Sequence, residues 1–301
     1  MRITSRMSYN NAMYGIENSL SRLYQVQEQL STGKRVNRPS DDPFAAHQAI
    51  SSRTRISFLE QYMDNARYTE TWANNTDSTL SNVIGTLQDT RVLAVQAIND
   101  TLAPAQREAI ADQVDQQRAA LMQLSAEQVG GSFLFSGTKT STVPFIDDPV
   151  NPGEVIYQGN EEAMVRNIAP GSSLSVNLNG IELFTGIGSG AKSVFKILSD
   201  MSQALRTGDK SGMHDALRDI DASLEQISAK RSEVGAKVNR LEKTALMLSS
   251  FIIDEVTELS NAEDLDISRG VMELSIRENA YQASLAAASR VIIPSLIDYL
   301  K

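Results

Sequence analysis

The sequence predicts a mainly α protein, in which a long antiparallel helical bundle with coiled-coil-like terminal helices carries a small inserted β domain. Three observations predict this fold. Apolar residues recur at steps of three and four through both flanks of the 301-residue chain. Glycine and proline gather between the flanks, since residues 131–190 hold nine of the 17 glycines and four of the eight prolines. Aromatic residues make up only 6% of the chain, so the core must be aliphatic and rich in alanine.

An amphipathic helix is expected near the start of the chain. Its apolar positions are Ile16, Leu20, Leu23, Val26 and Leu30. The segment 31–43 then breaks the pattern, because Gly33 can end a helix, Pro39 cannot continue one, and Pro43 suits the first turn of the next. We therefore predict an elbow at Gly33, Pro39 and Pro43.

A long helix should follow the elbow. Apolar residues recur every seven positions along it, at Leu59, Ala66, Ala73, Leu80, Leu87 and Ala94. This spacing is typical of a coiled-coil seam, and its alanines allow close helix approach. Pro104 then begins a further helix, whose buried face is expected to hold Ile110, Val114, Leu121 and Leu124.

The C-terminal flank is more regular. One heptad row holds Ile220, Ile227, Val234, Leu241 and Leu248, and the other holds Leu217, Leu224, Val238, Ala245, Ile252 and Leu259. Only Arg231 interrupts, and its stem could lie along the seam. A helix over residues 217–259 would be roughly 65 Å long. Because a rod of that length needs a partner, an antiparallel bundle with the N-terminal helices is the simplest arrangement.

A final amphipathic helix is predicted after a pause at residues 263–266. Its apolar positions are Val271, Leu274, Tyr281, Leu285 and Ile292, with Leu296 following the break at Pro294. Together with the five apolar positions of the first helix, these residues form a predicted assembly seam. The two ends could pair with each other within one chain, or other copies of the protein could complete their seams. A two-helix pair of this size buries little apolar surface, which favours assembly with other copies.

The middle of the chain is predicted to be β. Residues 154–160 read as a strand that enters a turn, and residues 173–178 alternate polar and apolar side chains. Asn179-Gly180 is a strong hairpin signal before a second strand at residues 181–184. A glycine-rich linker at residues 186–190 closes the insert.

These patterns predict three domains. They are a terminal coiled-coil assembly domain of residues 1–40 plus 262–301, an α-helical bundle domain of residues 41–135 plus 191–261, and a β-rich outer domain of residues 136–190. The first segment of the assembly domain carries six basic and two acidic side chains, and the second carries four basic and six acidic ones. The two segments are therefore complementary in charge as well as in period.

Composition argues against several functions. The net charge is -9, and no basic run is present that would suit nucleic acid. The absence of cysteine excludes thiolate metal sites and cysteine nucleophiles. His47 and His214 lack partners at metal-ligand spacing, so we predict no metal site, no cofactor and no catalytic residues. No apolar run is long enough to span a membrane, and no secretion signal is expected at the first residues.

Several segments resemble the flagellin superfamily. They are the opening Met1-Arg2-Ile3-Thr4, the block from Gln29 through Pro43, residues 280–287 and the closing residues 295–300. The stretch from Gly131 through Thr140, Gly-Ser-Phe-Leu-Phe-Ser-Gly-Thr-Lys-Thr, with the closing Leu296-Ile297-Asp298-Tyr299-Leu300, is similar to the hook-associated junction branch of that superfamily.

The resemblance implies a structural role without catalysis. Members place their terminal helices innermost, an α bundle outside them and a β domain outermost, and the elbow could adjust the angle between layers. The expected partners are copies of this chain, the first hook-filament junction protein, flagellin and an export chaperone. The expected location is the extracellular flagellum, after type III export without cleavage. A short flagellin that forms the filament itself is the alternative, and a cytoplasmic coiled-coil adaptor is a more distant one.

Overall fold

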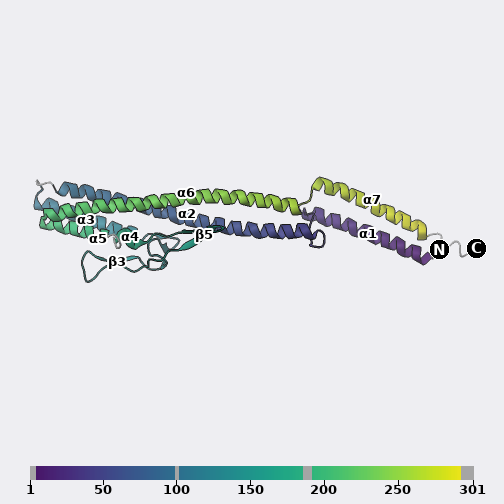
Figure 1. Ribbon diagram of the computed structural model, residues 1–301, viewed down its shortest axis with the longest axis horizontal. Coiled ribbons are helices and arrows are strands. Elements are labelled where there is room, and N and C mark those ends of the chain that lie inside the picture. The colour runs from purple at the N-terminus through teal and green to yellow at the C-terminus, as the bar shows by residue number, and fades with distance from the viewer. Residues whose placement is uncertain (1–4, 99–101, 186–191, 293–301) are drawn as a thin grey trace, which may run out of the picture. The chain divides into compact units, whose positions relative to one another are not determined.

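The computed structural model describes residues 5–98, 102–185 and 192–292. Its helices are α1 (Ser5–Thr32), α2 (Pro43–Ala97), α3 (Pro104–Ser125), α4 (Gly180–Phe184), α5 (Val194–Thr207), α6 (Lys210–Glu263) and α7 (Ile267–Ile292). Its strands are β1 (Gln128–Val129), β2 (Ser132–Phe133), β3 (Phe145–Asp147), β4 (Val155–Tyr157), β5 (Val165–Ala169) and β6 (Ser172–Ser175). The predicted mainly α fold with a small strand-containing insert is confirmed (Figure 1).

The predicted helix breaks are confirmed at residue level. α1 ends at Thr32, and Gly33 beyond it has the left-handed φ of +71° that favours glycine after a helix. α2 and α3 begin at Pro43 and Pro104, the positions where the missing amide hydrogen of proline is harmless. The predicted pause at residues 263–266 separates α6 from α7.

Contacts divide the chain into two compact units. The first unit takes in residues 1–58 and 251–301, and the second takes in residues 59–250. The three domains inferred from the sequence stay a prediction. Leu296, the other closing motif residues and the 186–190 linker lie outside the described residues.

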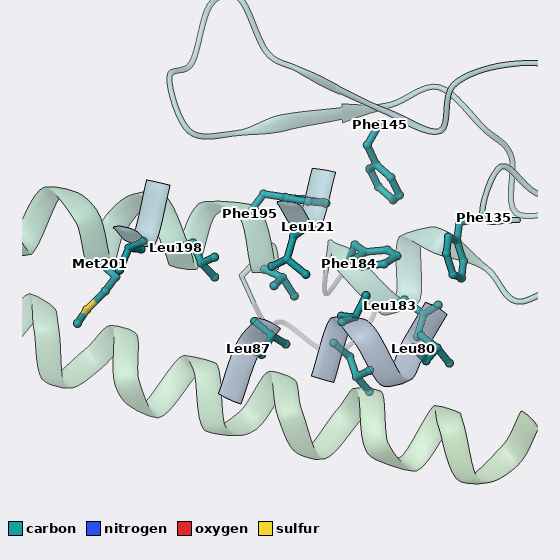
Figure 2. Close-up of a cluster of buried hydrophobic side chains, with 14 of the residues drawn as sticks. Leu80, Leu87, Leu121, Phe135, Phe145, Leu183, Phe184, Phe195, Leu198 and Met201 are labelled. Atoms are coloured by element: carbon teal, nitrogen blue, oxygen red, sulfur yellow. The ribbon is translucent and has the colours of Figure 1, made fainter. Parts of the chain in front are cut away.

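The long helices bury one predicted heptad row each, whereas the second predicted row of α6 is half-buried. In α2 the side chains of Leu80, Leu87 and Ala94 are fully buried, as are Ile220, Ile227, Leu241 and Leu248 in α6. Burying each leucine or isoleucine contributes about 1.5–3 kcal/mol relative to leaving it in water. Figure 2 shows Leu87 near Leu121 of α3, and Leu80 nearer Leu183 of α4, within one buried cluster.

Four phenylalanines join the insert to the helices of the same unit. Ring centroids are 5.3 Å apart for Phe135 and Phe184, 5.4 Å for Phe145 and Phe184, and 5.7 Å for Phe184 and Phe195. All four rings are almost completely buried (Figure 2). The first two pairs meet edge to face and the third is stacked, and aromatic pairs of both kinds add about 0.5–1.5 kcal/mol beyond the area they bury.

The hairpin predicted at Asn179-Gly180 is wrong. Residues 180–184 form the short helix α4, and the Asn179 side chain accepts a hydrogen bond from the Ile181 amide as its N-cap. The helix forms because it places Leu183 and Phe184 in the aromatic cluster. The strand at 172–175 instead pairs with β5 through a turn at Pro170-Gly171, where Gly171 has a φ of +71°.

The β5–β6 hairpin packs on helices of its own unit. Ile168 and Leu174 contact Ala66 of α2 and Leu241 of α6. The Asn65 side-chain amide donates to the Asn167 carbonyl at 2.9 Å, and the Arg166 guanidinium lies 4.1 Å from the ring centroid of Tyr68. These contacts hold the insert against the bundle.

Candidate assembly site

The terminal helices α1 and α7 lie side by side within the first unit (Figure 1). The C-terminal turn of α1 lies against the first turn of α7, so the pair is antiparallel. The structure therefore shows the intrachain pairing that the sequence left as one of two possibilities.

The predicted seam residues have mixed environments. Leu23 and Val26 are buried, whereas Ile16, Leu20, Leu30, Leu274 and Tyr281 are half-buried. Val271 and Leu285 are exposed, with 54% and 41% of their surface accessible. Ile292 is the last residue of α7, and Leu296 lies outside the described residues. Assignment of these residues to contacts with other copies stays a prediction.

A second apolar set on the same two helices is exposed. On α1 it holds Met7, Tyr14 and Tyr24, and on α7 it holds Ile267, Val271, Met272 and Ile276. Tyr14 is 72% exposed and Ile276 is 63% exposed. Several large apolar side chains exposed on one helix pair are more typical of a protein–protein contact than single scattered ones. We call these seven residues the outer apolar set.

Sequence reasoning missed most of the outer apolar set because it followed only one stripe on each helix. A signal was present: Met7 and Tyr14 are seven residues apart, and Met272 and Ile276 are four apart. Residues at these spacings share a helix face. Helices that carry apolar residues on more than one face are expected to contact more than one partner.

Side-chain hydrogen bonds to backbone amides shape the elbow and cap the start of α2. The Asp41 carboxylate accepts from the Arg38 amide at 2.9 Å, which closes the turn that contains the exposed Pro39. The Asp42 carboxylate accepts from the Ala45 amide at 3.1 Å, directly before Pro43. That backbone bond and the nearby Arg35 guanidinium lower the pKa of Asp42.

The elbow also pairs with the break between α6 and α7, and all of this pairing lies within the first unit. The Leu265 amide donates to the Gly33 carbonyl at 2.9 Å, and the Arg35 amide donates to the Glu263 carbonyl at 2.7 Å. Lys34 and Asp264 form an antiparallel bridge between these bonds. We call residues 33–36 against residues 263–265 the elbow contact.

Glu263 is the buried charge of the elbow contact. Only 5% of the residue is exposed, and its carboxylate forms ion pairs with Lys34 at 2.9 Å and with Arg53 of α2. Burial alone would raise the pKa of Glu263, but the hydrogen bonds from Arg53 and Lys34 outweigh burial and lower it. The carboxylate therefore stays ionised, and it joins the end of α6 to the α1–α2 connection and to α2.

A groove of about 610 Å³ lies between α1 and α7 beside the elbow contact. Four arginines, three carboxylates and two glutamines line most of it. Among the described residues, no histidine, serine, threonine or lysine lines it. Within the described ranges there is no metal-ligand cluster, and no helix that combines enough length and apolarity to span a membrane.

Comparison with known proteins gives relatives over most of the chain. The bacterial flagellin N-terminal helical region matches residues 3–140. Flagellar hook-associated protein 3 of Escherichia coli (strain K12) is 29% identical over 308 residues, which cover 95% of this chain and 96% of that protein. The Salmonella typhimurium protein of the same name is 29% identical over 94% of this chain and 95% of its own length. A flagellin of Bacillus subtilis is 26% identical over 96% of this chain and 97% of its own length.

Solved structures share the fold. The flagellar hook associated protein-3 of Legionella pneumophila has a TM-score of 0.64 at 15% identity, covering 70% of this chain and 97% of that one. FlgL of Xanthomonas campestris has a TM-score of 0.62 at 19% identity, covering 69% of this chain and 99% of that one. At such identities the likeness establishes the arrangement of helices and insert.

Proposed function

We propose that this chain, a relative of the flagellins and of flagellar hook-associated protein 3 over nearly its whole length, is the structural subunit that joins the hook to the filament of the bacterial flagellum. It acts by assembly, is not an enzyme, and works outside the cell. The observation that carries the proposal is its 29% identity with hook-associated protein 3 across 95% of the chain.

The outer apolar set supports assembly as the mode of action. Exposed tyrosine, methionine and isoleucine side chains on α1 and α7 have no covering segment among the described residues. Each of these side chains would gain about 1.5–3 kcal/mol if fully covered. Copies of this chain packed side by side in a helical lattice would cover them repeatedly, which suits a subunit of a tubular structure.

The partners follow from the same role. The chain assembles with flagellar components. We propose that these are other copies of itself, the first hook-filament junction protein on one side and flagellin on the other. In the cytoplasm an export chaperone holds the C-terminal segment before type III export. Because the predicted seam on α7 includes the exposed Val271 and Leu285, a chaperone would shield apolar surface there before assembly.

A deletion strain tests this function. Without a junction subunit, cells should carry hooks that lack filaments, and flagellin should accumulate in the medium because it is exported but not retained. A plasmid copy of the gene should restore filaments. If the chain were instead a short flagellin that forms the filament, deletion would give bare hooks without spilled flagellin.

A further inference from the structure

Glu263 occupies a position that local helix energetics disfavour. It is the last residue of α6, where the helix dipole places partial negative charge, so an acidic side chain there is unfavourable. It is also buried, which adds a desolvation cost. An acidic residue here does not stabilise α6, and a buried one does not make the protein more soluble. The role of Glu263 must therefore come from contacts with other segments.

Those contacts reach the α1–α2 connection and α2. Lys34 follows the end of α1 and Arg53 lies on α2, and both pair with the Glu263 carboxylate. The two cations are 40% and 50% exposed, whereas the Glu263 side chain is 7% exposed. The carboxylate is therefore the shared and buried partner of the network.

The backbone of the same segment also forms hydrogen bonds to the α1–α2 connection. The Glu263 carbonyl accepts from the Arg35 amide, and the Arg35 guanidinium donates to the Ala262 carbonyl at 2.9 Å. This arginine thereby satisfies a C-terminal carbonyl of α6 that has no partner within the helix. It also pairs with Asp42 at 3.1 Å, directly before α2.

Apolar packing near the elbow contact is limited. The buried cluster there consists of Val36, Ala45 and Ala46. Two of the three side chains are single methyl groups, so this cluster buries little area. Polar contacts centred on Glu263 therefore add to this small cluster where the two connections meet.

We propose that Glu263 couples the α1–α2 connection to the α6–α7 connection, so that α1 and α7 are presented to neighbouring subunits as one antiparallel pair. The step from coupling to subunit contact rests on the proposed function. The coupling itself is a property of the free subunit.

The first test is hydrogen exchange of the full chain in its monomeric form. Glu263→Gln keeps the size of the side chain but removes its charge, and charge-assisted hydrogen bonds exceed neutral ones in strength. The Arg35 and Leu265 amides and those of α1 and α7 should exchange about tenfold faster than in the wild type, because the neutral side chain holds Lys34 and Arg53 less strongly. Amides of α3 and α5 should not change.

A matched control is Glu278→Gln. Glu278 is an exposed acid on α7, and no ion pair to it is found among the described residues. This variant should exchange like the wild type. Lys34→Met removes one of the two cations and should give an intermediate acceleration, which keeps the test informative if Glu263→Gln folds poorly. Wild-type exchange at Arg35 and Leu265 in Glu263→Gln would overturn the coupling while leaving the proposed function intact.

The second test is filament attachment in cells that export each variant to the wild-type level. Glu263→Gln should reduce the fraction of hooks that carry filaments, whereas Glu278→Gln should not. Faster exchange in Glu263→Gln with normal attachment would overturn the claim that coupling serves subunit contact. Bare hooks with flagellin in the medium would show that the junction role holds and that the variant impairs it.

Discussion

Gly270 of α7 faces Leu30 of α1 so closely that a Cβ atom added to Gly270 would stand 2.9 Å from the Leu30 Cδ2 atom. The same Cβ would stand 2.9 Å from Leu265 Cδ2. The terminal helices thus meet at a position where only glycine fits without moving its neighbours, directly beside the elbow contact.

Gly270→Val should loosen the terminal helix pair. Overpacking of this kind costs about 1–3 kcal/mol, because Leu30 and Leu265 must leave their positions. Hydrogen exchange of α1 and α7 amides should accelerate about tenfold in the monomer, since 1.4 kcal/mol is a factor of ten. Gly15→Ala is the control: no atom lies within 4 Å of its Cβ position, and alanine favours the helix. Unchanged exchange in Gly270→Val would contradict the close contact.

Gly33→Ala should destabilise the elbow. Gly33 has a φ of +71° and open space around it, so the cost comes from the backbone and is about 1–2 kcal/mol. Gly33→Asn should cost less, because asparagine adopts left-handed conformations more readily. The order wild type, asparagine, alanine should appear in the exchange of the Leu265 amide, whose acceptor is the Gly33 carbonyl. Equal exchange in all three proteins would refute the requirement for a left-handed backbone at Gly33.

Pro39→Ala, in the exposed turn, should have a smaller effect on filament attachment than Gly33→Ala.

Ile276→Asp should block assembly without unfolding the subunit. Ile276 is 63% exposed, so the change should alter monomer stability by no more than about 0.5 kcal/mol. A neighbouring copy would have to bury the new charge, so filament attachment should be lost although the variant is exported and helical by circular dichroism. Val150→Asp is the control, since Val150 is 79% exposed in the β3–β4 turn. A swimming Ile276→Asp strain with full-length filaments would show that this face is not a contact.

Tyr157 should ionise late in an alkaline titration. Burial, and to a lesser degree the Glu161 charge, raises its pKa to about 12 from an ordinary value of 10.0. Because the folded state favours the neutral hydroxyl, its contribution to stability is present below pH 10 and is lost as the pH rises toward 12. Ultraviolet absorbance titration should show one late-ionising tyrosine, absent in Tyr157→Phe and retained in Tyr24→Phe. A late component that persists in Tyr157→Phe would assign the shift to another residue.

The helices and their ends could be predicted because the signals are local. Gly33, Pro43 and Pro104 determine where helices stop and start through their own backbone chemistry, whatever surrounds them. Heptad spacing likewise predicted that Leu80, Leu87 and Ile227 would be buried. These predictions required no knowledge of which segment lies opposite.

The insert was harder to predict because its contacts are not local. Asn179-Gly180 suits a hairpin turn, but burial of Leu183 and Phe184 against Phe135 and Phe195 favoured a helix with Asn179 as its cap. The Pro170-Gly171 turn of β5–β6 carried a local signal that was overlooked.

Charged contacts between distant segments had no sequence signal. One example is Arg231, whose guanidinium pairs with Asp77 through two bonds of 2.9 and 3.2 Å, whereas the position of its stem along the seam stays a prediction. The elbow contact joins residues more than 200 positions apart in the sequence. The sequence pattern therefore identified Glu263 only as part of the predicted break between two helices. The predicted elbow at Gly33, Pro39 and Pro43 marked one side of that contact.

As the proposed junction subunit, this chain should lie only where the hook meets the filament. Immunogold electron microscopy of intact purified flagella, with antibody raised against this chain, tests it most directly. We expect label confined to a short zone where the filament meets the hook. Label distributed along the filament shaft would contradict the claim and identify the chain as a filament subunit.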